Sequence, residues 1–154
     1  MYLIGLTGAI GHGKSTIAEI MSDLEPNSIT LETSGIISEV ATLLCSHFNE
    51  CDPKISDIQS VNTWISHIPH ILYDVLGISV DSDLFKLNNP DSLRNSVEFK
   101  KLWEFIVWAQ NNRNEIGEAI SPTNKSDYRP LLQWIGGFCV ENISPTIWNS
   151  ELLK

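Results

Sequence analysis

The sequence predicts an α/β fold, with a short parallel sheet of few strands and a large helical portion. An apolar run at residues 2–7 leads directly into a glycine-rich loop. A helical pattern follows, and then a second short run at residues 28–33 in which polar and apolar residues alternate. From residue 55 onward the apolar residues recur at helical spacing. Strand, helix, strand and helix in succession at the start of a chain imply parallel strands in one sheet.

The glycine-rich loop, Gly8 to Ser15, matches the P-loop motif G-x-x-x-x-G-K-[ST]. Glycines let successive backbone N–H groups point at a phosphate at the start of a helix, where the helix dipole favours an anion. Lys14 would reach the β- and γ-phosphates, and the Ser15 hydroxyl would ligate Mg²⁺. We therefore expect a P-loop NTPase-like fold that binds ATP and Mg²⁺. The predicted nucleotide contacts are Gly8, Ala9, Gly11, His12, Gly13, Lys14, Ser15 and Thr16.

The first 48 residues are predicted to form a βαβα unit. Residues 17–21 supply a helix that Glu25-Pro26 would end, and residues 28–33 form the second strand. Ser34 is a candidate N-cap for the next helix, which runs to Phe48. In an open α/β sheet the end of the second strand lies beside the phosphate loop, so Glu32, Thr33 or Ser34 could face a second substrate. A turn or capping role is the alternative for each of them.

Residues 55–154 are predicted to be mostly helical, with an irregular stretch at 78–92. The predicted helices are a pair within 55–76 that is broken near Pro69 and ends at Gly77, one at 96–112, one at 128–136 that continues toward 141, and one at 146–153 after Ser144-Pro145. His67 and His70 have a spacing seen in metal sites, but they have no obvious carboxylate partner, so a surface or capping role is favoured.

Composition sets the class of protein. The chain has 154 residues, 42% apolar and 19% charged, which predicts one globular domain over 1–154. Its net charge of −9 argues against a nucleic acid polymer as partner, because neutralising phosphates requires Lys and Arg. Three cysteines without metal-site spacing indicate reduced thiols. The sequence shows no signal peptide and no apolar stretch long enough for a membrane span, so we expect a cytoplasmic protein.

Two parts of a kinase site are not found in the sequence. No downstream apolar strand ends in an acidic residue of the Walker B type, and the arginines number three, Arg94, Arg113 and Arg129, which makes no lid. We therefore expect an N-terminal portion of a longer kinase, or a shortened relative. A sheet that is incompletely covered would also favour a homo-oligomer.

Two segments resemble known kinases. Residues 4–15 resemble the P-loop of small-metabolite and nucleotide kinases, among them dephospho-coenzyme A kinase. Residues 128–136, followed by 143–148 and 152–154, look like phage-type deoxynucleoside monophosphate kinases, which carry an Arg-x-x-Leu-Gln-x-x-Gly-Thr segment and then an Asp-x-x-Trp helix. The chain departs from that family at Gly137, in place of the threonine, and at Glu141, in place of a following arginine.

The resemblance implies transfer of the γ-phosphoryl group of ATP to a small phosphate acceptor, a (deoxy)nucleoside monophosphate. Lys14 and Arg129 would be the catalytic groups, with Mg²⁺ on Ser15. Ser34, Arg129 and Gln133 would contact the acceptor, Arg129 through a bidentate fork and Gln133 at a base edge. A solvated arginine at a helix start is the alternative for Arg129, and a role without substrate contact is the favoured alternative for Gln133. A dephospho-coenzyme A kinase-like enzyme, and a nucleotide-binding module without turnover, stay open as alternative functions.

Overall fold

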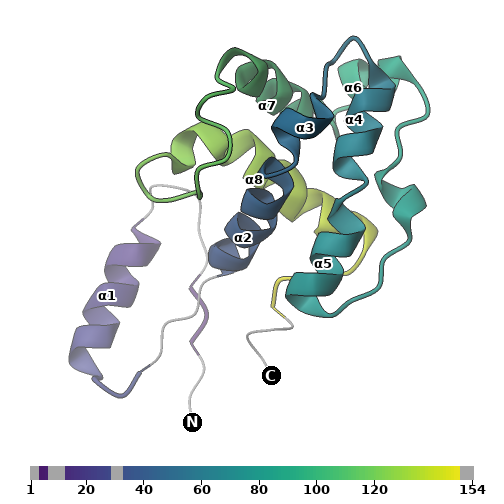
Figure 1. Ribbon diagram of the computed structural model, residues 1–154. Coiled ribbons are helices and arrows are strands. Elements are labelled where there is room, and N and C mark those ends of the chain that lie inside the picture. The colour runs from purple at the N-terminus through teal and green to yellow at the C-terminus, as the bar shows by residue number, and fades with distance from the viewer. Residues whose placement is uncertain (1–3, 7–12, 29–32, 150–154) are drawn as a thin grey trace. The chain divides into compact units, whose positions relative to one another are not determined.

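The computed structural model describes residues 4–6, 13–28 and 33–149, and the chain forms two compact units, residues 1–32 and 33–154 (Figure 1). The first unit contains helix α1, Lys14–Leu24. The helix ends at Glu25, whose N–H donates to the Met21 carbonyl at 3.0 Å, just before Pro26. The predicted stop at Glu25-Pro26 is therefore confirmed. None of the residues of α1 is buried.

The second unit is built from helices. Their bounds are α2 Thr33–Cys45, α3 Phe48–Cys51, α4 Ile58–Ile65, α5 Ile68–Leu76, the 3₁₀ helix η1 Ser82–Phe85, α6 Pro90–Asn95, α7 Lys100–Asn111 and α8 Lys125–Asn142. Over the described residues the β-type pairing is limited to two isolated bridges, Lys54 with Asp57 and Ile116 with Glu118. In the same part of the chain, no helix has both the length and the apolar character that crossing a bilayer requires.

The predicted α/β fold with a parallel sheet is wrong, because the described residues contain helices and no strand. Residues 4–6 are irregular, Ser28 is irregular, and Thr33 already belongs to α2; the rest of both predicted strands lies outside the described residues. A strand needs neighbours that accept and donate its backbone hydrogen bonds. Between residues 33 and 149, which the structure describes, the apolar residues follow helical periodicity and pack helix on helix, so no such neighbour exists in that range. The sheet-edge argument for a homo-oligomer loses its basis for the same reason.

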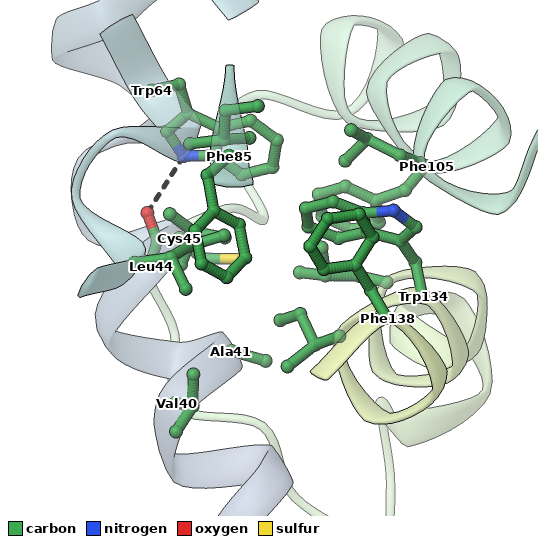
Figure 2. Packing of buried hydrophobic residues seen from close by; sticks show 14 of the residues in the cluster. Val40, Ala41, Leu44, Cys45, Trp64, Phe85, Phe105, Trp134 and Phe138 are labelled. Atoms are coloured by element: carbon green, nitrogen blue, oxygen red, sulfur yellow. Dashed lines mark hydrogen bonds between the residues drawn. The ribbon is translucent and has the colours of Figure 1, made fainter. Parts of the chain in front are cut away.

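Helix α8 is central to the second unit: it packs against α7 on one side and α2 on the other, and α2 also packs against α5. Large side chains from these helices meet in one buried cluster (Figure 2). The Trp64 indole N–H donates to the Leu44 carbonyl at 2.9 Å, which ties α4 to α2 inside the core (Figure 2). The Trp64 ring also lies 5.1 Å from Phe48 and 6.1 Å from Phe105, centroid to centroid. Pairs of this kind contribute about 0.5–1.5 kcal/mol each beyond the area that they bury.

Several predicted helix ends are confirmed and others move. Helix α5 ends at Gly77, which has a left-handed φ of 68° as a C-terminal glycine should. The break before α5 lies at Ser66 and His67, and Pro69 sits in the first turn of the helix instead of at the break. Helix α8 begins at Lys125, one turn earlier than predicted. Residues 145–149 form turns where the helix predicted at 146–153 would begin, and the rest of that predicted helix lies outside the described residues. Helix α6 occupies part of a stretch predicted to be irregular.

Candidate functional site

The glycine-rich loop is described from Gly13 onward. Gly8, Ala9, Gly11 and His12, four of the predicted nucleotide contacts, lie outside the described residues. Gly13 is the N-cap of α1, with φ 80° and ψ 18°. Side chains disfavour this left-handed conformation, and glycine adopts it at little cost. The Gly13 carbonyl accepts the first intrahelical hydrogen bond, from the Ile17 N–H at 3.0 Å, so the helix begins at the lysine of the motif.

The start of α1 is suited to an anion. No side chain caps it, and its first turn contains no acidic residue. The first N–H groups of any helix have no partner within that helix, and the dipole places a partial positive charge there. Lys14 is half-buried at this end, and the Ser15 and Thr16 side chains are exposed beside it. A phosphate at this position would meet backbone donors, one ammonium group and two hydroxyls.

The predicted acceptor residues lie on two helices of the second unit. Ser34 is the second residue of α2 and is half-buried, so it lies inside the helix and does not cap it. Arg129 and Gln133 are exposed on α8, one turn apart. Side chains four residues apart share a face of a helix, so the structure brings this predicted pair together.

Both departures from the resembling family also lie on α8, C-terminal to this pair. Gly137 and Glu141 follow Gln133 at successive intervals of four residues, and both are exposed. Arg129 forms no ion pair with another described residue. Glu141 adds a negative charge three turns along, which disfavours a second anionic group at that end of the helix.

Metal binding finds little support beyond Ser15. Among the described residues there is no group of three or more His, Cys, Asp or Glu side chains that could hold an ion. A triphosphate that arrives with its own Mg²⁺ would need Ser15 alone from this part of the chain.

An open groove in the second unit was not predicted from the sequence. It has a volume of about 460 Å³ and lies between α2 and the segment that leads into α8. Glu39 and Lys125 give it one charge of each sign. The Thr42 hydroxyl accepts the Ile120 N–H at 3.3 Å and joins its two walls. The groove is lined by Gly35, Ser38, Glu39, Thr42, Leu43, Ile120, Ser121, Pro122 and Lys125.

The loop wall of this groove has a local signal in the sequence, but the groove itself does not. The Asn124 side chain accepts the Ser121 N–H at 2.7 Å and fixes the turn before α8. Serine and asparagine in Ser121-Pro-Thr-Asn124 are typical of such a turn. Its contact with α2 joins residues 78 positions apart, from Thr42 to Ile120, and no local pattern reports that contact.

Comparisons of this chain with protein-family models, with curated proteins and with solved structures find no match.

Proposed function

We propose that the chain binds the phosphates of a nucleoside triphosphate, ATP, at residues 8–16. The observation that carries the proposal is the coincidence of motif and helix: the lysine of G-x-x-x-x-G-K-S is the first residue of α1, and the glycine before it has the left-handed conformation. Binding of this kind relies on backbone N–H groups, a helix dipole and one lysine, all of which are local to the loop and the helix.

The net charge of −9 sets a condition on this proposal. A free triphosphate is repelled by an acidic protein at low ionic strength, and Mg²⁺ reduces that repulsion by neutralising part of the charge of the ligand. The proposed ligand is therefore MgATP, whose cation the Ser15 hydroxyl would bind.

Calorimetric titration of the full chain with MgATP tests the proposal. We expect Lys14→Ala to weaken binding about ten- to hundredfold, the range for loss of one hydrogen bond to a charged group. Gly13→Val should also weaken binding, because a β-branched residue does not adopt a φ of 80° without strain. Lys100→Ala, which removes an exposed lysine from α7, is the matched control and should leave the affinity unchanged. Absence of MgATP binding by the unmodified chain would refute the proposal.

A second candidate function is transfer of the γ-phosphoryl group to a (deoxy)nucleoside monophosphate. The pairing of Arg129 and Gln133 on one exposed face of α8 favours it, because a fork of donors and a carboxamide one turn apart suit a phosphate and a base edge. Dephospho-coenzyme A is the alternative acceptor, since the phosphate loop says nothing about the acceptor.

Formation of ADP tests this second function, with a panel of nucleoside monophosphates and dephospho-coenzyme A as acceptors. Turnover with one acceptor, lost in Lys14→Ala, is the result expected of a kinase. Arg129→Ala should raise KM for that acceptor more than it lowers kcat, whereas Arg94→Ala, an exposed arginine of α6, should change neither. MgATP binding without ADP formation from any acceptor would identify a nucleotide-binding module and rule out the kinase.

A further inference from the structure

Two histidines from separate corners of the second unit lie face to face. His47 is in the turn between α2 and α3, and His67 is in the turn between α4 and α5. Their rings are 3.9 Å apart, centroid to centroid, and only 4° from parallel. Both side chains are half-buried. The Cys51 thiol of α3 is 3.7 Å from the Nε2 atom of His67, which places a third polar group at the same point.

The backbone N–H groups of both histidines donate hydrogen bonds to core residues of the two corners. The Leu44 carbonyl accepts both the His47 N–H, at 3.1 Å, and the Trp64 indole N–H, at 2.9 Å. The Trp64 carbonyl in turn accepts the His67 N–H at 3.3 Å. These hydrogen bonds join the two corners, and the stacked rings join the same two corners a second time. Separation of the rings would therefore weaken the contact between the corners.

The surroundings of His67 favour a neutral ring. His67 is the N-cap residue of α5, where the helix dipole disfavours a positive charge. Burial lowers the pKa of His67, and the nearby His47 and His70 lower it further, while Glu50 acts in the opposite direction. A histidine whose pKa is lowered in the closed form takes up its proton more readily in the open form. Acid therefore favours separation of the rings, between about pH 6.5 and the lowered pKa of the closed form.

The other charged groups of the packed elements do not cancel this effect. Helix α4 has no titratable side chain between Ile58 and Ile65. On α5, His70 is exposed and paired with Asp74 at 3.4 Å. Helix α2 carries Glu39, two turns before the corner, and the Cys45 thiol, whose pKa burial raises to about 12, so that it stays neutral. Glu50 on α3 is then the one carboxylate among the groups that act on His67.

We propose that the stacked pair of His47 and His67 is an acid-sensitive switch. Near neutral pH the rings hold the α2–α3 corner against the α4–α5 corner, and uptake of protons by both rings releases that contact while the remaining core stays packed. Two imidazolium groups in a parallel stack repel each other, so the second proton is taken up as the two corners separate. The inference is independent of nucleotide binding at residues 8–16.

Amide hydrogen exchange of the full chain between pH 7.5 and 5.5, corrected for the intrinsic rates, tests the switch. Two backbone N–H groups report on the contact between the corners: the Cys51 N–H donates to the His47 carbonyl and the Ile71 N–H donates to the His67 carbonyl, each at 3.0 Å. Each proton taken up on opening changes the opening constant by up to about tenfold per pH unit. We expect the opening constant to change little between pH 7.5 and 6.5 and to rise between pH 6.5 and 5.5 at both reporters in the unmodified protein.

Two matched variants separate the switch from general acid sensitivity. His47→Phe keeps an aromatic ring in the stack without its proton, and it should make the rise in the opening constant below pH 6.5 shallower than in the unmodified protein. His70→Gln removes an exposed ring from the same helix α5 and should leave the dependence unchanged. A wild-type dependence in His47→Phe, or equal exchange at pH 7.5 and 5.5 in the unmodified chain, would overturn the proposal.

A titration by NMR of the histidine ring protons keeps the test decisive if His47→Phe does not fold. In the unmodified chain the midpoint of His67 should lie below the ordinary value for histidine. In His47→Gln it should move upward, because a neutral amide replaces the ring that opposes its protonation. A His67 midpoint at or above the ordinary value in the unmodified chain would contradict the switch.

Discussion

The adjacent glycines of α8 provide a pair of substitutions that measures how closely α8 packs on α2. A methyl group added at Gly137 would contact nothing within 4 Å. A methyl group added at Gly136 would lie 3.3 Å from the Cδ1 atom of Ile37. The two changes are chemically identical and occur one residue apart in the same helix, so a difference between them reports the contact with Ile37.

The expected magnitudes follow from two opposing effects. Alanine is favoured over glycine inside a helix by about 1 kcal/mol, so Gly137→Ala should raise the free energy of unfolding by about that amount. Gly136→Ala has the same helical gain, but a 3.3 Å contact forces Ile37 to move, and overpacking costs about 1–3 kcal/mol. We therefore expect Gly136→Ala to be less stable than Gly137→Ala by about 1–3 kcal/mol.

Urea denaturation followed by tryptophan fluorescence measures this difference. All five tryptophans of the chain lie in the second unit, so the signal reports the unfolding of that unit. Ile37→Val removes the Cδ1 atom, and in its presence the cost at Gly136 should disappear, leaving a coupling of about 1 kcal/mol or more. Equal stabilisation by both alanines, or the same cost at Gly136 with valine at position 37, would refute the close packing of α2 on α8.

Three further predictions concern single residues of the second unit. Asn62→Ala should lower the free energy of unfolding in urea by about 1–3 kcal/mol, because it removes two 2.8 Å hydrogen bonds between the Asn62 carboxamide and the backbone of Leu87. An unchanged midpoint of urea denaturation would contradict a stabilising role for Asn62. Hydrogen bonding from a neighbouring amide, with help from adjacent cations, lowers the pKa of Asp52. Its contribution to stability is therefore complete above about pH 3.9 and is lost as the pH falls through the lowered folded-state pKa. In thermal melts recorded at a series of pH values, Asp52→Asn should weaken the loss of stability at acid pH, and an unaltered loss would contradict this role. Iodoacetamide at pH 8 should alkylate the partly exposed Cys51 in the native chain and spare Cys45, because burial raises the pKa of Cys45 to about 12. Peptide mass spectrometry measures the labelling, and equal labelling of both cysteines would contradict the burial of Cys45.

The helices of the second unit were largely predictable because their apolar residues repeat at helical spacing. The end of α5 followed from Gly77, and the apolar residues of α7 recur at helical spacing and include Phe105, which is fully buried. These signals are local: each depends on residues within one or two turns of the chain. The sheet was predicted from a motif and two short runs, and a strand also requires partners far along the sequence. The helical pattern after residue 33 had already excluded those partners.

One local signature had opposite outcomes in two places. Asn89-Pro90 begins α6, with the Asn89 side chain accepting the Asp91 N–H at 2.7 Å, although that stretch was predicted to be irregular. Ser144-Pro145 was predicted to begin a helix, and turns follow it instead. Helix α6 places Leu93 in the core. After Pro145 the adjacent side chains of Ile147 and Trp148 are both buried, and the Trp148 indole donates to the carbonyl of Gly136. These tertiary contacts decide between helix and turn, and the signature does not contain them.

The candidate site follows the same division. The start of α1 at Lys14 and the shared face of Arg129 and Gln133 could be predicted, because both depend on helix geometry alone. The groove beside α2 and the stacking of His47 on His67 could not. His67 was considered together with His70, its neighbour in sequence, whereas its partner in space is 20 positions earlier. Sequence spacing predicts which residues share an element and does not predict which corners meet.

The carboxamide of Asn62 has a consequence for what the fold can accommodate. It is hydrogen-bonded to the backbone of Leu87, and Gly77 ends α5, so the residues between Gly77 and Leu87 form a connection whose two ends are fixed. Within that stretch, Ser79 is exposed and lies in irregular backbone before η1, which places Phe85 in the core. Lengthening a loop whose ends are already fixed costs little, about 0.6 kcal/mol for each doubling of its length. The backbone at Ser79 is therefore a point at which the protein can accept inserted sequence, such as an epitope or a whole foreign domain, without loss of its core.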